Sequence, residues 1–483
     1  MNTANSDVTI RQIMDQSGVR FGTSGARGLA ADMTAPVCFA YTAAFLQVVS
    51  PPAGGRVALG LDLRPSSPDI AGACAAAIRH AGLIPEFCGV LPTPALAYYA
   101  QEQGIPAIMV TGSHIPFDRN GIKFYRATGE ITKADEAGIA AATVALPGEV
   151  RPDPLPEASP AARELYARRY LGFFPAGILA GLRLGFYEHS SVARDQLRGI
   201  LEALGAEVTS LGRTDQFVPI DTEAVGEEDV ARARLWSETQ GFDALLSTDG
   251  DADRPLIGDE RGEWLRGDVV GILCARYLGA RAVATPVSSN TALEKCGAFA
   301  RITRTRIGSP YVIEGMGRLA AEGATGVVGF EANGGFLVGT RMEKAGRSLA
   351  ALPTRDAVLP ILALLAMARE QGVPLSRLPA ELPPRFTASD RLQDFPVADS
   401  RRLIERLAAS HEALRDFLAP LDVRPAGLDL TDGLRVSLEG GEIVHLRPSG
   451  NAPELRCYAE AATPARAREL ADACLARVRA WGA

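Results

Sequence analysis

Short apolar runs alternate with longer amphipathic stretches along most of the chain. Runs rich in β-branched residues predict buried strands, and stretches with apolar residues three and four positions apart predict helices. The predicted strands are residues 56–62, 106–111, 182–187, 242–247, 282–286 and 326–330. The predicted helices are residues 70–82, 192–205, 310–322, 355–371, 401–417 and 464–481. This alternation is typical of α/β domains, in which helices cover a mostly parallel sheet.

Two proline-rich segments and a change of pattern divide the chain. Residues 151–160 contain four prolines and predict a linker, and residues 374–384 form a second proline-rich segment. Beyond it, Asp432-Gly433 and Gly440-Gly441 predict hairpin turns between short strands, followed by a last helix. We therefore expect three α/β domains, over residues 1–155, 156–258 and 259–372, and a smaller α+β domain over residues 373–483.

The composition is that of an ordinary globular protein with several domains. The chain has 483 residues, of which 47% are hydrophobic and 22% are charged, so it exceeds what one hydrophobic core usually spans. A net charge of −7 without a basic stripe indicates that nucleic acid is not a partner. The longest apolar run, residues 357–368, is too short to span a bilayer and predicts a buried helix, so no membrane is expected. Both a monomer and a homodimer stay open.

Cysteine usage and the N-terminus indicate the cellular compartment. The seven cysteines are scattered and form no C-x-x-C pair, which argues against a disulfide framework or a zinc site. Residues 1–12 are polar and lack the apolar core of a signal peptide. We expect a reducing environment and a cytoplasmic protein.

A serine stands in a turn at the end of the predicted strand 106–111. The segment from residue 110 to residue 125 reads VTGSHIPFDRNGIKFY, with Ser113 in the turn, His114 beside it and Lys123 downstream. A serine hydroxyl at such a place can accept a phosphoryl group and so divide one difficult transfer into two. No G-x-S-x-G elbow is present, and the adjacent Ser113 and His114 side chains are poorly placed as a nucleophile–base pair, which argues against a serine hydrolase. A turn whose polar groups only satisfy backbone donors stays open.

Three carboxylates, Asp249, Asp251 and Asp253, follow the predicted strand 242–247 at alternate positions. With glycine between the first two, they can converge on one octahedral cation. Counted from Asp249, Glu260 falls at the last position of an EF-hand calcium loop, but Arg254 stands where that loop needs glycine, and a strand precedes it. A solvated acidic turn is a further alternative.

Three further loops offer groups for sugar and phosphate. Glu331 and Asn333 follow the predicted strand 326–330, and a glutamate there needs partners such as sugar hydroxyls, although a capped turn explains it equally well. A glycine-rich loop at residues 21–28 contains Ser24 and supplies a fixed positive charge, Arg27. Near the C-terminus, guanidinium, hydroxyl, amide and backbone N–H groups suit a phosphate dianion, with a plain surface turn as the alternative. The residues of this last cluster are Arg447, Ser449, Gly450, Asn451 and Arg456.

In their order and wording, these motifs resemble those of the α-D-phosphohexomutases, in the phosphomannomutase/phosphoglucomutase branch. FGTSGARG at residues 21–28 is similar to the N-terminal signature of that family, and TGSHIPFDRNGIKFY at residues 111–125 to its phosphoserine loop. DGDADR at residues 249–254 resembles the metal loop, GFEANGG at residues 329–335 the sugar-binding loop, and RPSGNAPELR at residues 447–456 the phosphate-binding loop. The resemblance therefore covers nearly the whole chain.

The resemblance implies four domains around a central cleft, three of them similar α/β units and the last a smaller mobile one. It implies that Ser113 carries the phosphoryl group and shares Mg²⁺ with Asp249, Asp251 and Asp253. It gives the catalytic group as Ser113, Lys123, Arg27 and His114, of which Arg27 and Lys123 handle protons or stabilise charge. Arg254 then lies beside the metal loop, and Glu331 and Asn333 contact sugar hydroxyls. The phosphate that does not react is held by Arg447, Ser449, Gly450, Asn451 and Arg456.

The implied activity is that of a phosphomannomutase, which interconverts mannose 6-phosphate and mannose 1-phosphate with hexose 1,6-bisphosphate as activator and a small-molecule sugar phosphate as substrate. The chain departs from the common family pattern at Gly112, Ile115, Asn333, Gly335 and the segment Asn451-Ala452-Pro453. Phosphoglucomutase and phosphoglucosamine mutase activities therefore stay open, as do a Mg²⁺-dependent sugar phosphatase and a non-catalytic phosphosugar- or calcium-binding regulator.

Overall fold

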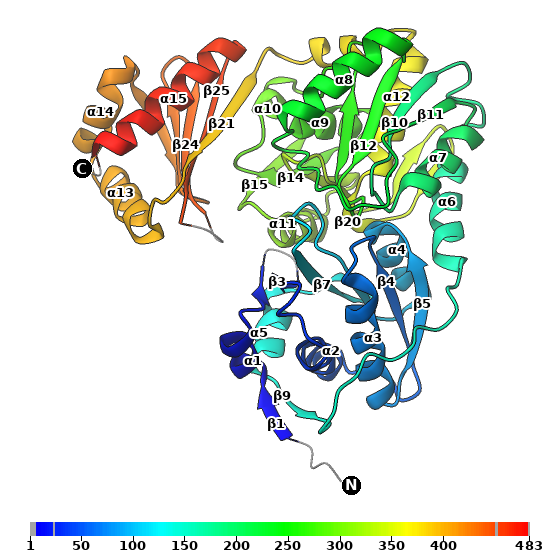
Figure 1. The fold of residues 1–483 in the computed structure, drawn as a ribbon. Helices are drawn as coiled ribbons and strands as arrows, with labels where there is room; N and C mark the ends of the chain where they lie inside the picture. The colour runs from blue at the N-terminus through cyan, green and yellow to red at the C-terminus, as the bar shows by residue number, and fades with distance from the viewer. Residues whose placement is uncertain (1–5, 23–24, 450–452, 482–483) are drawn as a thin grey trace.

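The computed structural model describes residues 6–22, 25–449 and 453–481. Four units, each built around one large sheet, follow one another along the chain, and we refer to them as domains I to IV. In Figure 1, domain I lies at the bottom, domains II and III lie above it on the right, and domain IV lies at the upper left. The expected architecture of several α/β domains is confirmed, whereas the limits at residues 155, 258 and 372 stay predictions.

Domain I has a sheet with the strand order β2-β3-β7-β6-β4-β5, and β8 pairs with β7. Successive side chains of a strand point to opposite faces. Leu59 and Ile108 therefore join the core of α2 and α3, while Ala58 and Met109 join the core that contains α4. The strands are β2 (Arg20–Phe21), β3 (Ala26–Leu29), β4 (Arg56–Leu61), β5 (Ile84–Val90), β6 (Ala107–Val110), β7 (Arg119–Arg126) and β8 (Gly129–Glu130). The helices are α1 (Ile10–Ser17), α2 (Ala35–Val49), α3 (Ser67–His80), α4 (Thr93–Gln103) and α5 (Lys133–Ala141), and β1 (Ser6–Thr9) pairs with β9 (Thr143–Leu146).

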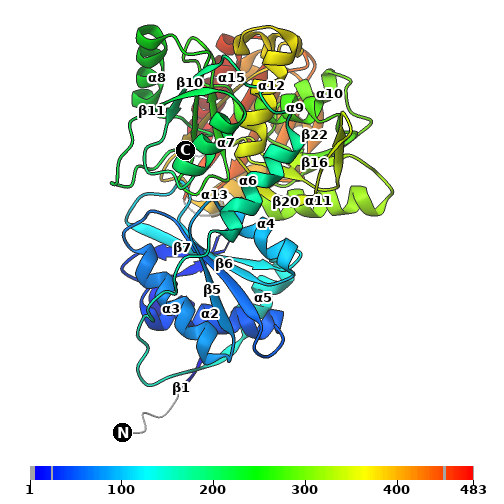
Figure 2. The same ribbon diagram turned by 90° about the vertical axis from the view of Figure 1, so that its right-hand side faces the viewer.

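Domain II follows residues 151–160, the predicted linker, which form no helix or strand. Its sheet has the order β11-β10-β12-β13, with β10, β11 and β12 parallel and β13 antiparallel. The strands are β10 (Arg183–Tyr187), β11 (Glu207–Leu211), β12 (Ala244–Thr248) and β13 (Pro255–Gly258). The helices are α6 (Ala161–Phe173), α7 (Arg194–Ala203) and α8 (Glu227–Gln240). Figure 2 shows that α6 runs upward from domain I beside α7 and so connects the two domains.

Domain III has the strand order β15-β14-β16-β17-β20, and its helix α12 is buried along most of its length. The strands are β14 (Ala282–Pro286), β15 (Arg301–Thr305), β16 (Val327–Phe330), β17 (Phe336–Val338), the hairpin of β18 (Met342–Lys344) and β19 (Arg347–Leu349), and β20 (Leu352–Asp356). The helices are α9 (Gly267–Tyr277), α10 (Ala292–Lys295), α11 (Ser309–Ala321) and α12 (Val358–Gln371), followed by the 3-10 turns η1 (Leu375–Arg377) and η2 (Pro379–Glu381).

Domain IV is the predicted smaller α+β unit, with an antiparallel sheet in the order β21-β25-β24-β23-β22. The hairpins expected at Asp432-Gly433 and Gly440-Gly441 join β22 to β23 and β23 to β24. The strands are β21 (Phe386–Leu392), β22 (Pro425–Asp429), β23 (Leu434–Leu438), β24 (Ile443–Pro448) and β25 (Leu455–Ala461). The helices are α13 (Val397–Ala409), α14 (His411–Leu418), the 3-10 turn η3 (Ala419–Leu421) and α15 (Pro464–Trp481).

Packing differs between the first three domains and the last. One hydrophobic cluster runs from Tyr98 of α4 through Tyr166 of α6 and Leu197 of α7 to Leu362 of α12. Domain IV has a separate core. Polar contacts join it to domain III, for example the bond from the backbone N–H of Ile307 to Asp432 Oδ2 (2.9 Å). Domains I to III therefore form one packed body.

Two predicted helices differ from the structure. The helix expected over residues 355–371 begins only at Val358, because Arg355 and Asp356 end strand β20, whose pairing with β17 overrides the local pattern. The helix expected over residues 401–417 consists of α13 and α14. Ser410 separates them because its backbone is extended, and its Oγ accepts the N–H of Ala413 (3.1 Å) and so caps α14.

No single helix in the described ranges is long and apolar enough to cross a membrane. Helix α12 and the 3-10 turns after it, bent by 92°, pass the same criterion only as a pair, by length and composition. The seven cysteines are free, and six of them are buried.

Candidate functional site

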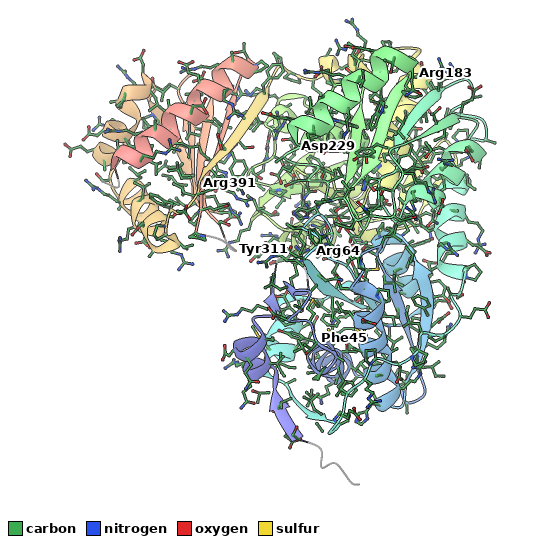
Figure 3. All side chains as sticks on the ribbon, viewed as in Figure 1. Phe45, Arg64, Arg183, Asp229, Tyr311 and Arg391 are labelled. Atoms are coloured by element: carbon green, nitrogen blue, oxygen red, sulfur yellow. The ribbon has the colours of Figure 1, made fainter. Side chains whose placement is uncertain are left out.

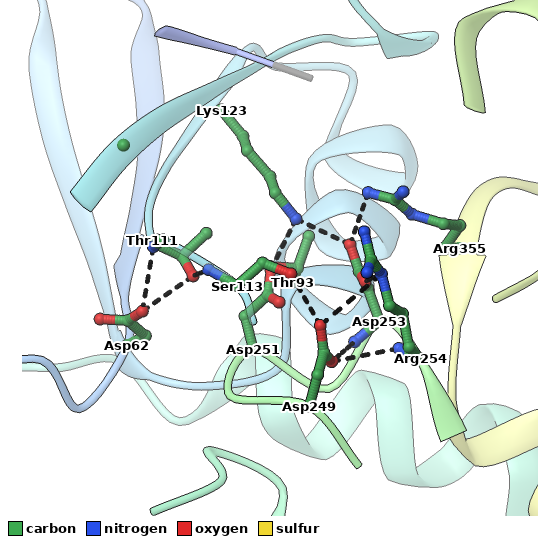
Figure 4. Close-up of polar contacts among 12 residues, drawn as sticks. Asp62, Thr93, Thr111, Ser113, Lys123, Asp249, Asp251, Asp253, Arg254 and Arg355 are labelled. Carbon is green, nitrogen blue, oxygen red and sulfur yellow. Dashed lines mark hydrogen bonds and ion pairs between the residues drawn. The ribbon is translucent and has the colours of Figure 1, made fainter. Parts of the chain in front are cut away.

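Loops that follow three buried strands supply the predicted chemistry, as is expected at the carboxyl ends of strands in α/β sheets. The serine loop (residues 111–119) follows β6, the metal loop (residues 249–254) follows β12, and the sugar loop (residues 329–335) contains the end of β16. The loops come from domains I, II and III. Figure 4 shows the serine loop and the metal loop in direct contact, with Arg355 of domain III beside them.

Ser113 is the point of contact between the serine loop and the metal loop. Its side chain is fully buried, and its Oγ donates to Asp249 Oδ2 (2.7 Å). His114 Nδ1 lies 3.4 Å from the same oxygen. The backbone of Ser113 is left-handed, with φ of 54°, a conformation that side chains disfavour. The predicted nucleophile of domain I therefore faces the aspartates of domain II, as the family resemblance implies.

A buried guanidinium holds the backbone of the serine loop, and sequence reasoning missed it. Arg64 Nη2 donates to the carbonyl oxygens of Ser113 (3.0 Å) and Ile115 (2.6 Å). Its Nη1 donates to those of Pro116 (2.7 Å) and Arg119 (3.0 Å). Four carbonyls of one loop thus converge on a rigid, planar fork, which stabilises the strained conformation of Ser113.

Arg64 is itself fixed from two sides. Its Nε donates to Asp62 Oδ2 (3.2 Å), and its guanidinium lies 3.9 Å from the ring centre of Phe217 in domain II. Only glycine fits at position 112, because an added Cβ would lie 2.5 Å from Arg64 Cζ. At Gly250, a Cβ would lie 2.9 Å from the carbonyl oxygen of Ser113. Figure 3 shows Arg64 at the junction between domain I and the domains above it. The available signal in the sequence was the charged pair of Asp62 and Arg64 at the end of the predicted strand 56–62.

Replacing Arg64 with lysine should lower kcat about 100-fold and leave KM nearly unchanged, because a displaced nucleophile misaligns the transfer without removing substrate contacts. Steady-state kinetics on the folded fraction checks this result. The control is Arg79→Lys, which alters the surface pair of Arg79 Nη1 with Asp153 Oδ2 (2.7 Å) and should leave both constants unchanged. If Arg64→Lys lowers only the melting temperature, Arg64 does not position Ser113.

The three aspartates of the metal loop form a buried cluster. One oxygen from each carboxylate lies within 4.8 Å of those of the other two. Lys123 Nζ donates to Asp251 Oδ2 (2.6 Å) and Asp253 Oδ2 (2.7 Å). The other oxygens, Asp251 Oδ1 and Asp253 Oδ1, are buried and have no hydrogen-bond partner in the described part of the chain. Carboxylate oxygens left in this way are fit ligands for a hard cation, so the cluster supports a metal cofactor.

The surroundings of the cluster shift the pKa values of Asp249 and Asp253 in opposite directions. Burial raises the pKa of Asp249 well above its usual value, and repulsion from Asp251 and Asp253 raises it further. Burial acts in the same direction on Asp253, but Arg355, Lys123 and Arg254 outweigh it and lower the pKa of Asp253. Burial disfavours charged Lys123, yet Asp251 and Asp253 raise its pKa, so the ammonium is retained. The ammonium of Lys123 therefore neutralises part of the negative charge of Asp251 and Asp253.

The calcium-loop alternative is wrong. The metal loop connects two strands, β12 and β13, where an EF-hand has helices. Glu260, which that reading needs as a ligand, accepts the backbone N–H of Ser376 through Oε2 (3.2 Å).

Arg355 connects the metal loop to the sugar loop. Its Nη2 donates to Asp253 Oδ2 (2.9 Å), and its Nη1 donates to Glu331 Oε2 (3.1 Å). Glu331 is buried, and Asn333 Oδ1 accepts the backbone N–H of Gly335 (2.9 Å). Because Arg355 falls within the predicted helix 355–371, its contacts were not expected from the sequence. A polar Thr-Arg-Asp triplet before a long apolar run was the available signal.

Positive charge gathers beside Ser113. Arg254 Nε lies 3.5 Å from Asp253 Oδ1 and 3.9 Å from Asp249 Oδ2. The charge of Arg254, followed by burial and the charge of Arg27, lowers the pKa of His114 to about 2, so the ring is neutral. Burial, followed by the charges of Arg254 and Arg355, lowers the pKa of Arg27 to about 10. Such a concentration of guanidinium groups suits a phosphoryl group.

The predicted phosphate cluster lies in domain IV. Arg447 and Arg456 stand opposite each other on β24 and β25, and like charges so placed favour an anion between them. Arg447 Nε donates to Asp432 Oδ2 (3.0 Å). Ser449 is buried at the end of β24. Gly450 and Asn451 lie outside the described residues, as does Ser24 of the N-terminal loop. We refer to Arg447, Ser449 and Arg456 as the phosphate clamp, and no described contact joins them to Ser113.

Comparison with models of protein families identifies the family to which the chain belongs. Models for "Phosphoglucomutase/phosphomannomutase, alpha/beta/alpha domain I" match residues 18–146, those for "alpha/beta/alpha domain III" match residues 266–386, and those for the "C-terminal domain" match residues 394–477. The chain therefore belongs to the phosphoglucomutase/phosphomannomutase family.

Individual relatives cover nearly the whole chain. A phosphomannomutase of Salmonella muenchen is 47% identical over 468 residues, which are 97% of each protein. A phosphomannomutase of Sinorhizobium fredii is 46% identical over 464 residues, covering 94% of this chain and 97% of the relative. A phosphoglucosamine mutase of Symbiobacterium thermophilum is 30% identical and covers 88% of this chain and 96% of the relative. The crystal structure of a phosphoglucomutase/phosphomannomutase family protein from Burkholderia thailandensis has the same fold, with a TM-score of 0.73 at 20% identity, over 95% of this chain and 97% of that one.

Proposed function

We propose that the protein is a phosphomannomutase, an isomerase that interconverts mannose 6-phosphate and mannose 1-phosphate through phosphorylated Ser113. The bond from Ser113 Oγ to Asp249 Oδ2 (2.7 Å) carries this proposal, because it joins a buried hydroxyl to a cluster suited to a cation. The relatives that are 46% and 47% identical bear the name phosphomannomutase, which favours mannose over the other hexoses.

The reaction would move one phosphoryl group out and another back. The bond between phosphorus and Ser113 Oγ would break while a bond from phosphorus to the free hydroxyl oxygen of the sugar phosphate forms, and the proton of that hydroxyl would pass to Ser113 Oγ. The hexose 1,6-bisphosphate would then reorient in the site. In the second transfer the bond from its other phosphorus to the sugar oxygen would break, a bond from that phosphorus to Ser113 Oγ would form, and the serine proton would pass to the released sugar oxygen. The same bisphosphate, added from outside, would act as the activator that first loads Ser113.

The residues around Ser113 suit such a transfer. Asp249, Asp251 and Asp253 would hold Mg²⁺, together with an oxygen of phosphorylated Ser113. When bound, the ion supplies positive charge to the transferring group. Arg27, Lys123 and Arg254 add fixed positive charge, which is the main contribution that proteins make to phosphoryl transfer. Exclusion of bulk water from the ester of Ser113 would make the protein a mutase instead of a phosphatase.

The other end of the substrate would bind across the molecule. Glu331 and Asn333 would contact sugar hydroxyls, and Arg447, Ser449, Gly450, Asn451 and Arg456 would hold the phosphate that does not react. A clamp of guanidinium and backbone groups accepts a phosphate in either orientation of the sugar. Its placement on domain IV, which has a separate core, allows the clamp to move with the substrate.

A coupled assay with mannose 1-phosphate, glucose 1-phosphate and glucosamine 1-phosphate tests the proposed function. We expect the highest kcat/KM with mannose 1-phosphate. A higher kcat/KM with glucosamine 1-phosphate would show that the protein is a phosphoglucosamine mutase and that mannose is the wrong sugar. Release of free phosphate without isomerised sugar would show that the protein is a sugar phosphatase instead of a mutase.

Replacing Arg447 with alanine should raise KM about 10- to 100-fold and leave the loading of Ser113 intact, because a charged hydrogen bond to a phosphate contributes about 1.5–3 kcal/mol. Steady-state kinetics and mass spectrometry of Ser113 check the two parts. The control Arg402→Ala on α13 removes an exposed guanidinium that pairs with Asp399 and should change neither. An unchanged KM in Arg447→Ala would show that the clamp is wrongly assigned.

A cytoplasmic location stays our prediction, supported by the seven free cysteines.

A further inference from the structure

Glu223 stands where domain II approaches both the sugar loop and the phosphate clamp. It belongs to the loop between β11 and α8. Asp221 Oδ1 accepts the backbone N–H of Glu223 (3.0 Å) and turns the loop. Thr222 Oγ1 donates to the carbonyl oxygen of Asn333 (2.7 Å) and is buried. The position of Glu223 is therefore fixed relative to the sugar loop.

A cavity of about 350 Å³ opens between this loop and domain IV. Glu223 lines it from domain II, and Arg391, Arg456 and Tyr458 line it from domain IV. Figure 3 shows Arg391 on the side of domain IV that faces the middle of the molecule. The volume falls within the range of small-molecule sites, roughly 300–1,000 Å³. The cavity thus lies between the loop that contains Glu223 and Arg456 of the phosphate clamp.

The carboxylate of Glu223 has charged neighbours but no ion-pair partner among the described residues. Burial raises the pKa of Glu223, Asp221 adds to this effect, and Arg266 and Arg254 oppose it. Arg266 is engaged elsewhere, since its Nε pairs with Asp268 Oδ1 (3.3 Å). Arg456, which lines the cavity from domain IV, pairs through Nη2 with Glu454 Oε2 (3.7 Å). A carboxylate so placed is an unused acceptor, which makes hydrogen bonds with hydroxyl groups favourable.

The sugar loop leaves room for an acceptor from another domain. Asn333 Oδ1 is taken by the backbone N–H of Gly335, and Gly335 has no side chain. Glu331 Oε2 accepts from Arg355. Part of the acceptor capacity of the sugar loop is therefore used within the protein, so an acceptor from another domain would add to what Glu331 and Asn333 offer a sugar.

We propose that Glu223 is a specificity-determining residue that accepts hydrogen bonds from the ring hydroxyls of the bound phosphohexose. The proposal rests on the proposed function, because it takes a hexose phosphate as the ligand. Arg254, Arg266 and Arg456 offset the repulsion between this carboxylate and the phosphate group of the substrate. Glu223 thus contacts the sugar from domain II, between the sugar loop and the phosphate clamp.

Calorimetric titration of the full chain tests this role, with mannose 1-phosphate and its 2-deoxy, 3-deoxy and 4-deoxy analogues. The variant Glu223→Gln keeps the size of the side chain and removes its charge. It should bind mannose 1-phosphate about tenfold more weakly, because a charged acceptor becomes a neutral one. On the analogue that lacks the contacted hydroxyl, the variant and the unaltered protein should bind equally well.

Equal affinity of both proteins for mannose 1-phosphate would overturn the proposal. So would the same loss of affinity on all three deoxy analogues, because that pattern indicates a structural change without contact to one hydroxyl. The matched control is Glu228→Gln on α8, whose exposed carboxylate pairs with Arg232 and should not affect binding. Turnover of mannose 1-phosphate by the unaltered protein is measured separately, so failure of the proposed function is distinguished from failure of the role of Glu223.

Discussion

Ser113→Ala should lower kcat for isomerisation by at least about 10⁴-fold while the fold stays intact, because the variant has no atom that can carry the phosphoryl group. The substitution removes one buried hydroxyl, whose bond to Asp249 Oδ2 contributes about 1.5–3 kcal/mol at most. The folded state therefore persists, and sugar-phosphate binding persists with it. A coupled assay gives kcat, and circular dichroism with thermal unfolding gives the state of the fold.

A second serine provides the control for this variant. Ser400 on α13 is also buried, and its Oγ donates to the carbonyl oxygen of Pro396 (3.3 Å) in domain IV. Ser400→Ala should keep nearly normal activity. Nearly normal rates in Ser113→Ala would show that another group carries the phosphoryl group.

Asp251→Asn should lower kcat by about 10³-fold and weaken metal binding, because the cluster loses one of its three charges. Asp251 Oδ2 accepts from Lys123 Nζ and from Thr93 Oγ1 (2.5 Å), and an asparagine can keep only part of this network. Mg²⁺ should raise the melting temperature of the unaltered protein and should have little effect on the variant. Thermal unfolding with and without Mg²⁺ measures this directly, independent of turnover.

Glu260→Gln is the matched control, because Glu260 belongs to the calcium-loop reading and bonds to Ser376 instead of the cluster. Its response to Mg²⁺ should equal that of the unaltered protein. If Asp251→Asn responds to Mg²⁺ normally, the three aspartates are not the metal site.

The sequence predicted the parts of the site that single motifs encode. Ser113 and Asp249 each follow a buried strand in a glycine-containing turn, so local pattern was enough to find them. Their contact was implied by the resemblance to the phosphohexomutases. Arg355 could not be found in this way, because its role depends on β20 lying against β17, a pairing made by tertiary structure. Ser410 was missed for a simpler reason, since helical periodicity continues across the serine that caps α14.

Contacts between domains were harder to predict than the motifs themselves. Arg64 bonds to four carbonyls of a loop about fifty residues away and stacks on Phe217 of another domain, which no periodicity encodes. Glu223 is held near the sugar loop by the bond of Thr222 to Asn333, a contact between two domains. Local sequence therefore specifies the groups that we propose to react, while the fold specifies the groups that we propose to position them.

The transfer of a labelled phosphate tests the central claim most directly. The protein is incubated with hexose 1,6-bisphosphate that carries a labelled phosphate, separated from it, and digested for mass spectrometry. We predict that the label lies on the peptide with Ser113 and passes to added mannose 6-phosphate or mannose 1-phosphate. Label on another residue, or label that is released only as free phosphate, would contradict the account.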